Sequence, residues 1–351
     1  MKKILTLALC LCMVLTLATM FASCGEADYK LGMGVVVSMD SSKTGNAQVD
    51  ATVATVVTDA DGKIVACRID VAQNKFDLTK DFATEAAKTF KTKMELGNDY
   101  GMAPAKIDND GNGVTKEWFE QAKAFESYVV GKTVAEVKAM KTQEKGGHQI
   151  AVDQALLDAG CSMQITDFIA AVTKAGEDAQ GMSFTAKKDS FTLGVAATTA
   201  VDKDTKAATA EANGLVAMYT DFAASVVADG KIIATLNDAI QPKIAIKANG
   251  EIAEKTFVDT KRALKENYNM ATYGAQMDPN GDGKVLEWYV QSAEFSKFVI
   301  GKTATEVAAL ETKANSIGYQ MTTDETLLAA GCTIQITAIK AVVAQSAKNA
   351  R

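Results

Sequence analysis

The chain contains an internal repeat, with matching stretches about 170 residues apart. The two copies keep their landmarks in the same order along the sequence. Asp61-Gly62-Lys63-Ile64 returns as Asp229-Gly230-Lys231-Ile232, Glu117-Trp118 returns as Glu287-Trp288, and Gly160-Cys161 returns as Gly331-Cys332. This period is much longer than the roughly 20 to 50 residues of solenoid units. We therefore expect two copies of one domain, each with a hydrophobic core of its own.

Each copy is expected to begin with antiparallel strands. Residues 48–58 place Val49, Val53 and Val57 on one side, as a half-buried strand does. Asp61-Gly62 is typical of a hairpin turn, after which the chain would return as the partner strand. The second copy repeats this pattern, with strands expected at 215–227 and 231–237 and a further turn at Asn249-Gly250.

Helices are expected to follow the strands in each copy. Apolar residues recur at the spacing of one helix face. They are Trp118, Ala122, Phe125 and Val129 in the first copy, followed at the matching positions by Trp288, Phe295 and Val299 in the second. Thr133 with Glu136, and Thr303 with Glu306, predict capping boxes at the next helices. Strands followed by helices indicate the α+β class with antiparallel sheet.

The end of each copy and the boundaries between units can also be predicted. Residues 162–165 and 333–336 are expected to form short strands, after which Thr166 and Thr337 would cap the closing helices. The expected division is 1–23 signal peptide, 24–28 lipidated tether, 29–175 first repeat, 176–190 linker and 191–351 second repeat.

The N-terminus predicts export and lipid anchoring. Lys2 and Lys3 precede an uncharged apolar run, the pattern of a secretory signal. The stretch Phe21-Ala22-Ser23-Cys24 then resembles the lipobox of bacterial lipoproteins, although the family usually has Leu where this chain has Phe21. The resemblance implies cleavage before Cys24, acylation of its thiol, and a place on the outer face of the cytoplasmic membrane or the cell surface. The alternative is a plain signal anchor with Cys24 unmodified.

Composition excludes several classes of function. The formal net charge is −6 and aromatic residues make up 7%, so no basic or stacking surface is expected and nucleic acid is excluded as a partner. Cys67, Cys161 and Cys332 remain after Cys24 and the signal cysteines are set aside, and this odd number predicts no disulfide framework. Cys161 and Cys332 occupy matching positions in the two repeats, so both are expected to be small buried residues. The one histidine, His148, is expected at the surface.

The repeat landmarks resemble the FMN-binding domain of sodium-pumping quinone reductases, Rnf complexes and flavinylated surface lipoproteins. In that family an Asp-x-x-Ser/Thr-Gly-Ala-Thr/Ser motif carries FMN on its last hydroxyl. The resemblance implies Ser162 and Thr333 as the candidate FMN acceptors. The motif is degenerate, because the leading acid, the inner hydroxyl and the alanine are replaced. The replacements are Leu156, Ala159 and Cys161 in the first copy and Leu327, Ala330 and Cys332 in the second. The alternative is a stretch of small residues where a buried strand packs closely.

An oxygen-rich loop in each copy predicts a calcium site. The shared pattern is D-x-[DN]-x-[DN]-G-x-x-x-E, and calcium binds six to eight oxygen ligands in proteins. The candidate ligands are Asp108, Asp110, Asn112 and Glu117 in the first copy, and Asp278, Asn280, Asp282 and Glu287 in the second. The spacing resembles the compact loop of excalibur-type calcium motifs more closely than an EF-hand. The alternative is a turn that caps a helix.

Two functions follow from these features. The first is a non-catalytic, calcium-stabilised surface module that binds a ligand or partner and is held to the membrane by lipid on Cys24. The second is an extracytoplasmic electron-transfer flavoprotein, in which covalent FMN supplies the redox chemistry. A hydrolase is not expected, because no nucleophile has a candidate base beside it.

Overall fold

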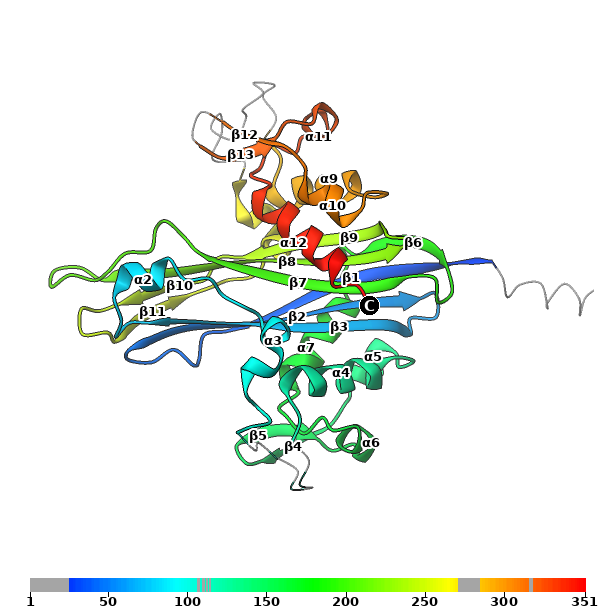
Figure 1. Ribbon diagram of the computed structural model, residues 1–351, viewed down its shortest axis with the longest axis horizontal. Helices are drawn as coiled ribbons and strands as arrows, with labels where there is room; N and C mark the ends of the chain where they lie inside the picture. Colours follow the sequence, from blue (N-terminus) through cyan, green and yellow to red (C-terminus); the bar gives the residue numbers. More distant parts are fainter. Residues whose placement is uncertain are drawn as a thin grey trace, which may run out of the picture.

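The computed structural model describes residues 25–105, 108, 111, 113, 115–270, 285–315 and 318–351. Its centre consists of two antiparallel sheets, one from each half of the chain (Figure 1). The first contains β1 (Glu26–Ser38), β2 (Asn46–Asp59), β3 (Ile64–Asp77) and β6 (Met182–Lys187), in the order β3-β2-β1-β6. The second contains β7 (Thr192–Val201), β8 (Gly214–Ala228), β9 (Lys231–Ile240), β10 (Lys243–Ile246) and β11 (Ile252–Thr256).

Helices and short strand pairs form a lobe on the outer face of each sheet (Figure 1). The first half contributes α3 (Lys93–Leu96), η2 (Gly97–Tyr100), α4 (Trp118–Val129), α5 (Val134–Lys138), β4 (Thr142–Lys145), β5 (His148–Ala151), α6 (Gln154–Asp158) and α7 (Thr166–Gly176). The short helix α2 (Phe82–Ala86) instead lies at one end of the sheets, where Phe82 and Ala86 pack against the core between them (Figure 1). The second contributes α8 (Lys261–Leu264), η3 (Lys265–Tyr268), α9 (Trp288–Phe298), α10 (Ala304–Ala308), β12 (Thr312–Ala314), β13 (Gln320–Thr322), α11 (Glu325–Ala329) and α12 (Thr337–Lys348). The predicted α+β class with antiparallel sheet is confirmed.

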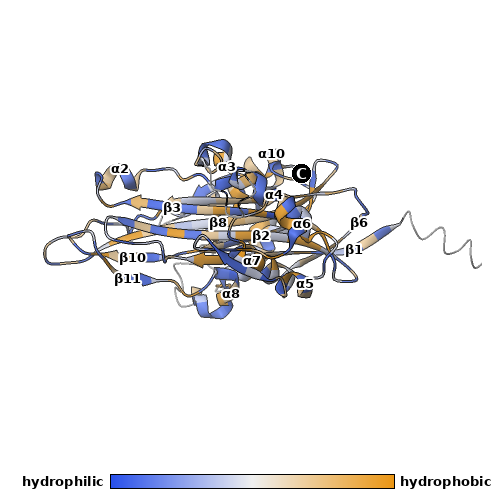
Figure 2. Cartoon of the chain, turned by 90° about the horizontal axis from the view of Figure 1, so that it is seen from below, coloured by the Kyte–Doolittle hydropathy of each residue, from blue (hydrophilic) through white to orange (hydrophobic). Residues whose placement is uncertain are grey.

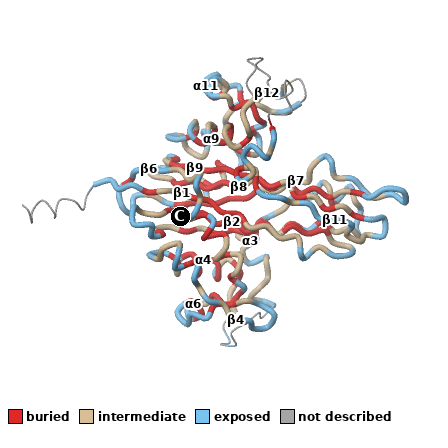
Figure 3. The backbone as a smooth tube through the Cα atoms, turned by 180° about the vertical axis from the view of Figure 1, so that it is seen from behind, coloured by how far each residue is buried: buried red, intermediate tan, exposed pale blue. Residues whose placement is uncertain are grey.

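Three apolar cores hold these layers together. One lies between the sheets and contains side chains from both halves, including Leu31, Val49, Leu193 and Phe222. The other two lie between each sheet and its own helices. Buried residues therefore concentrate on the central strands, while the hairpin tips are exposed (Figure 3). Hydrophobic residues likewise run along the strands, whereas α8 is largely hydrophilic (Figure 2). Each half thus has a core of its own, as expected, and a third core that the sequence did not predict lies between the two halves.

The two-residue period of the strands explains how one sheet serves two cores. Leu31, Met33 and Val35 of β1 point into the core between the sheets. The intervening Gly32 and Gly34 lie under α7, where an added Cβ would collide with backbone atoms of that helix. At these positions β1 therefore packs on the partner sheet with large side chains and on α7 with bare backbone.

Local signals for turns and caps are largely confirmed. β2 and β3 form the predicted hairpin across Asp61-Gly62, and β10 pairs with β11 across the turn at Asn249-Gly250. Both capping boxes form, with the Thr133 and Thr303 hydroxyls accepting from the backbone N–H of Glu136 and Glu306.

Two other local predictions are wrong. The predicted linker, 176–190, contains β6, which pairs with β1 and so completes the first sheet. Residues 162–165 and 333–336 form no strand; Ile165 and Ile336 are the N-caps of α7 and α12, so Thr166 and Thr337 are the first helical residues and do not cap. These stretches pack small and apolar side chains under the helices. Each makes a single backbone hydrogen bond to a strand, from the N–H of Ile165 to the carbonyl of Gln149 in β5 and from the N–H of Ile336 to the carbonyl of Gln320 in β13.

Candidate functional site

The two candidate FMN acceptors occupy matching, buried positions. Ser162 and Thr333 are each 5% exposed, and each follows a glycine–cysteine pair. The backbone N–H of Ser162 donates to Oε1 of Gln121 at 3.0 Å, and that of Thr333 donates to Oε1 of Gln291 at 2.7 Å. The Thr333 hydroxyl also donates to Gln291, at 3.3 Å. An ester to a flavin phosphate at either hydroxyl would have to open this packing.

Gln121 and Gln291 were not singled out by the sequence, although each lies three residues after the recurring tryptophan. Both are buried, and both use the two ends of the amide. Nε2 of Gln121 donates to the carbonyl of Lys116 at 3.0 Å, and Nε2 of Gln291 donates to the carbonyl of Leu286 at 2.7 Å. Each glutamine therefore ties the start of α4 or α9 to the acceptor stretch. The recurrence of the glutamine was the signal that could have identified it.

Glycine and cysteine in the acceptor stretch have structural reasons. Gly160 and Gly331 both have φ +88°, a left-handed conformation that glycine adopts without strain. Cys161 and Cys332 are buried, as is Cys67, and none of the three forms a disulfide. Burial raises the pKa of Cys161 and of Cys332 to about 12, so both thiols are protonated at neutral pH. The prediction that Cys161 and Cys332 are small buried residues is confirmed.

The predicted calcium ligands are only partly within the described residues. Asp110, Asn112, Asp278, Asn280 and Asp282 lie outside them. Asp108 accepts from the N–H groups of Gly111 and Gly113, at 2.8 Å and 2.7 Å, so its carboxylate closes the loop on itself.

The two glutamates at the ends of the loops accept backbone N–H groups. Glu117, which is 4% exposed, accepts from Met102 and Ala103, and Glu287 accepts from Met270. These contacts tie the turn after η2 or η3 to the following helix. Among the described residues, no three His, Cys, Asp or Glu side chains come together in a way that could hold a metal ion. Calcium at the loops stays a prediction.

A lysine lies over two aromatic rings at the same place in each half. Nζ of Lys93 is 4.8 Å from the ring centre of Tyr100 and 5.5 Å from that of Trp118. In the second half, Nζ of Lys261 is 5.0 Å from Tyr268 and 5.3 Å from Trp288. These distances are those of cation–π contacts. All six residues recur in the sequence, but only the fold shows that they meet.

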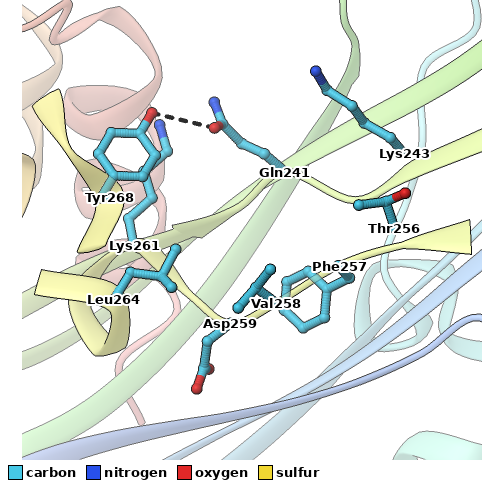
Figure 4. A pocket seen from close by; sticks show the side chains of 9 residues that line it. All are labelled: Gln241, Lys243, Thr256, Phe257, Val258, Asp259, Lys261, Leu264 and Tyr268. Atoms are coloured by element: carbon cyan, nitrogen blue, oxygen red, sulfur yellow. Dashed lines mark hydrogen bonds between the residues drawn. The ribbon is translucent and has the colours of Figure 1, made fainter. Parts of the chain in front are cut away.

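A pocket of about 260 Å³ lies next to this cluster in the second half (Figure 4). It forms where β9 ends and β10 begins, between the chain after β11 and the α8–η3 segment. Its lining residues are Gln241, Lys243, Thr256, Phe257, Val258, Asp259, Lys261, Leu264 and Tyr268. The Tyr268 hydroxyl donates to Oε1 of Gln241 at 3.2 Å, which joins the two walls.

Of the charged side chains that line this pocket, Lys261 and Asp259 have partners in the described part of the chain and Lys243 does not. Lys261 is engaged with its two rings and lies near Asp221, where burial raises the pKa of that carboxyl to about 6 and Lys261 lowers it. Asp259 accepts the backbone N–H of Thr260 at 2.8 Å. The backbone of Lys243 pairs with the neighbouring strands, but its side chain has no ion pair or hydrogen bond to any described residue. The pocket therefore presents one unpaired cation beside aromatic and aliphatic side chains.

Three predictions remain, which concern His148, the lipidation site and the membrane. His148 is exposed at the start of β5, as predicted. Cys24, the predicted lipidation site, lies outside the described residues. Within the described part of the chain, none of the helices is both long and apolar enough to cross a membrane.

Comparisons with known proteins give one partial sequence match. No family model matches the chain. A chlorophenol reductase from Desulfitobacterium hafniense is 36% identical over 100 residues, covering 25% of this chain and 28% of the reductase. A solved structure from Bacteroides fragilis, described as an exported protein with a YmcC-like fold, is 10% identical over 65% of this chain and 92% of its own, with a TM-score of 0.12. The chain thus spans less than a third of the reductase and is similar to it only there.

Proposed function

We propose that the chain is a lipid-anchored, extracytoplasmic module that binds a small ligand without transforming it. The observation that carries this proposal is the pocket between Gln241 and Tyr268, which combines an unpaired lysine with aromatic side chains. Pockets with mainly apolar walls and a few placed polar groups are the usual form of small-molecule sites. The duplicated halves would hold this pocket on a rigid double sheet outside the cell, with acyl chains on Cys24 attaching it to the membrane.

The ligand should remain bound when the protein is extracted gently from membranes. Native mass spectrometry of the wild-type chain is expected to detect one small molecule per chain. Leu264→Trp, whose larger side chain would fill the pocket, should lose that molecule while keeping the same unfolding midpoint within ~2 °C. Detection of no ligand in the wild type, or of the same ligand in both proteins, contradicts the proposal.

The anchor is tested separately. Cys24→Ala removes the thiol that would carry the acyl chains, so the variant should no longer mature as a lipoprotein. Intact mass measurement should show diacylglyceryl-modified Cys24 as the first residue of the wild type and no lipid in the variant. A wild-type mass that retains residues 1–23 would support the plain signal anchor instead.

A flavoprotein is the second candidate function. The partial similarity to a reductase favours it, as do the matching hydroxyls of Ser162 and Thr333. The burial of those hydroxyls against Gln121 and Gln291 opposes it. Co-expression with a flavin transferase in an exporting host decides between the two: a yellow protein with an FMN mass increment, lost in Ser162→Ala plus Thr333→Ala, would replace the ligand-binding proposal.

Calcium is proposed to stabilise the loops at 108–117 and 278–287. A ligand that binds only the folded state raises the unfolding midpoint. We expect a higher midpoint in millimolar calcium than in chelator, and a smaller difference in Asp108→Asn plus Asp278→Asn. Equal midpoints in calcium and chelator for the wild type would remove calcium from the proposal.

A further inference from the structure

We infer that the pocket between Gln241 and Tyr268 takes a small organic anion, with its charged group at Lys243 and its ring or chain against the apolar wall. This inference rests on the proposed ligand-binding function and names the class of ligand. It follows from three features of the pocket, namely its unpaired donors, its apolar wall and the break in the strand that creates it.

Two unpaired donors belong to Gln241 and Lys243. The side chain of Lys243 has no acidic partner among the described residues. Lys261 also lines the pocket, but its ammonium lies over the Tyr268 and Trp288 rings. The amide oxygen of Gln241 is occupied by the Tyr268 hydroxyl, which leaves the amide NH₂ as a donor. Figure 4 shows the amide of Gln241 and the ammonium of Lys243 extending to the same side. Donors without acceptors on a positively charged wall match a carboxylate or another oxyanion.

The one acidic residue that lines the pocket, Asp259, does not pair with Gln241 or Lys243. Asp259 extends away from Gln241 and Lys243 in Figure 4, and its carboxylate accepts the N–H of Thr260 at the start of α8. Its charge is therefore directed to the backbone of that turn. An anion at Lys243 would therefore meet the ammonium of Lys243 and the amide of Gln241, on the side from which Asp259 points away (Figure 4).

The opposite side of the pocket is apolar and is lined by Phe257, Val258 and Leu264, while the Tyr268 ring lies beside Gln241 (Figure 4). Val258 is 80% exposed, the largest value among the exposed large hydrophobic residues described, so a ligand would cover it. Burying apolar surface of this kind favours binding by roughly 25 cal/mol per Å². The volume of about 260 Å³ is slightly below the usual ~300–1,000 Å³ of ligand pockets, which points to a small molecule.

The pocket exists because one strand is interrupted. β9 and β10 both pair with β8, but Gln241 and Pro242 separate them. Proline cannot donate to a strand ladder, so the chain leaves the sheet there and the Gln241 side chain turns toward Tyr268. In the first half, β3 runs without a break from Ile64 to Asp77.

A calorimetric comparison of an anion with its neutral counterpart tests the inference. Phenylacetate and phenylacetamide have the same ring and nearly the same size, but only the first is charged. We expect saturable, one-site binding of phenylacetate to the purified exported chain and at least about tenfold weaker binding of phenylacetamide. Lys243→Gln should weaken phenylacetate binding by about tenfold and leave phenylacetamide unchanged.

A lysine in another pocket provides the matched control. Lys30 lines a second pocket, beside the start of β1, where Asp28 and Asp59 make the wall acidic. Lys30→Gln should bind phenylacetate as the wild type does, and both variants should keep the wild-type unfolding midpoint.

Several results would overturn the inference. They are no saturable binding of phenylacetate, equal binding of the amide, and equal loss of affinity in the two lysine variants. A neutral molecule found in the pocket by native mass spectrometry would also overturn it, but would leave the ligand-binding function intact. Covalent flavin would instead remove the function on which the inference rests.

Discussion

Gln121 and Gln291 each join the start of a long helix to the stretch after the glycine–cysteine pair. Their side-chain oxygens accept backbone N–H groups of Ser162 and Thr333, and their amide nitrogens donate to backbone carbonyls at the helix start. Because the amides are buried, these hydrogen bonds replace the water that both ends would otherwise bind. The recurrence of Trp-x-x-Gln in the two halves is explained by this structural role.

Replacing Gln121 with leucine should be destabilising. Gln121→Leu keeps a similar volume but leaves the N–H groups of Ser162 and Met163 without their acceptor. We expect the free energy of unfolding to fall by ~1–3 kcal/mol, measured by urea titration. Gln154→Leu, on the exposed side of α6, is the control and should change it by less than ~0.5 kcal/mol. Similar losses in both variants would argue against the structural role.

Asp70 should make stability depend on pH. The side chain is 2% exposed and accepts the N–H groups of Val71 and Met94, and burial raises its pKa to about 7. An unfolded aspartate has a pKa near ~4, so between about pH 4 and 7 the unfolded chain has released a proton that the folded chain keeps. Raising the pH through this window therefore lowers the free energy of unfolding, by up to ~4 kcal/mol.

Asp70→Asn should remove this contribution, because asparagine stays neutral at every pH. Urea titrations at pH 4.5 and 7.5 should show a smaller difference between the two pH values in the variant than in the wild type. Asp61→Asn, in the exposed hairpin turn, should retain the wild-type difference. A variant that loses stability with rising pH as steeply as the wild type would rule out Asp70 as the group responsible.

At the scale of elements, two helices approach their sheets through glycine. Gly32 of β1 lies under the carbonyl of Ala175 in α7, and Gly194 of β7 lies under the carbonyl of Ser346 in α12. Each strand thus offers a side chain to the other sheet and bare backbone to its helix. This arrangement lets α7 and α12 lie unusually close to the strands that begin the two halves.

A methyl group at Gly194 should disturb this contact. In Gly194→Ala the Cβ would collide with the backbone of Ser346 and Ala350, so strand and helix must separate. We expect the free energy of unfolding to fall by ~1–3 kcal/mol in urea titration. Gly25→Ala is the control, since no atom lies within 4 Å of an added Cβ there. No difference between the two variants would mean that α12 adjusts without loss.

At the scale of the molecule, the two halves are joined into one body. The core between the sheets contains residues from both. Two ion pairs that cross between the halves have a largely buried carboxylate: Asp178, which pairs with Arg262 at 3.1 Å, and Glu126, which pairs with Arg351 at 2.7 Å. Figure 1 shows the helical lobes on opposite sides of this double sheet. Each half alone would expose one apolar sheet face to water.

Separating the halves should therefore expose a large apolar surface. Expressed alone, residues 25–189 or 190–351 should aggregate or self-associate, because contiguous apolar patches of this kind drive association. Co-expressed, they should elute together as a 1:1 complex in size-exclusion chromatography and unfold in one transition. Two soluble monomers that each unfold cooperatively would show that the shared core is dispensable.

The sequence by itself determined the local elements and their chemistry. The alternation around Val49, the turn at Asp61-Gly62, the capping boxes at Thr133 and Thr303, and the burial of Cys161 all follow from residues close together in the chain. Such features depend on backbone preferences and on a period of two or 3.6 residues, which a few neighbouring side chains define.

Only the tertiary structure decided which surfaces meet. β2 has apolar residues on both faces, with Val49 toward the other sheet and Ala54 toward the helices. Because the hydrophobic effect is not directional, this pattern shows that both faces are buried but not which element covers each face. The strand within the predicted linker, the glutamine contacts to Ser162 and Thr333, and the pocket at Lys243 likewise depend on residues distant in sequence. Their positions are set by how two sheets and their helices pack, which no local pattern encodes.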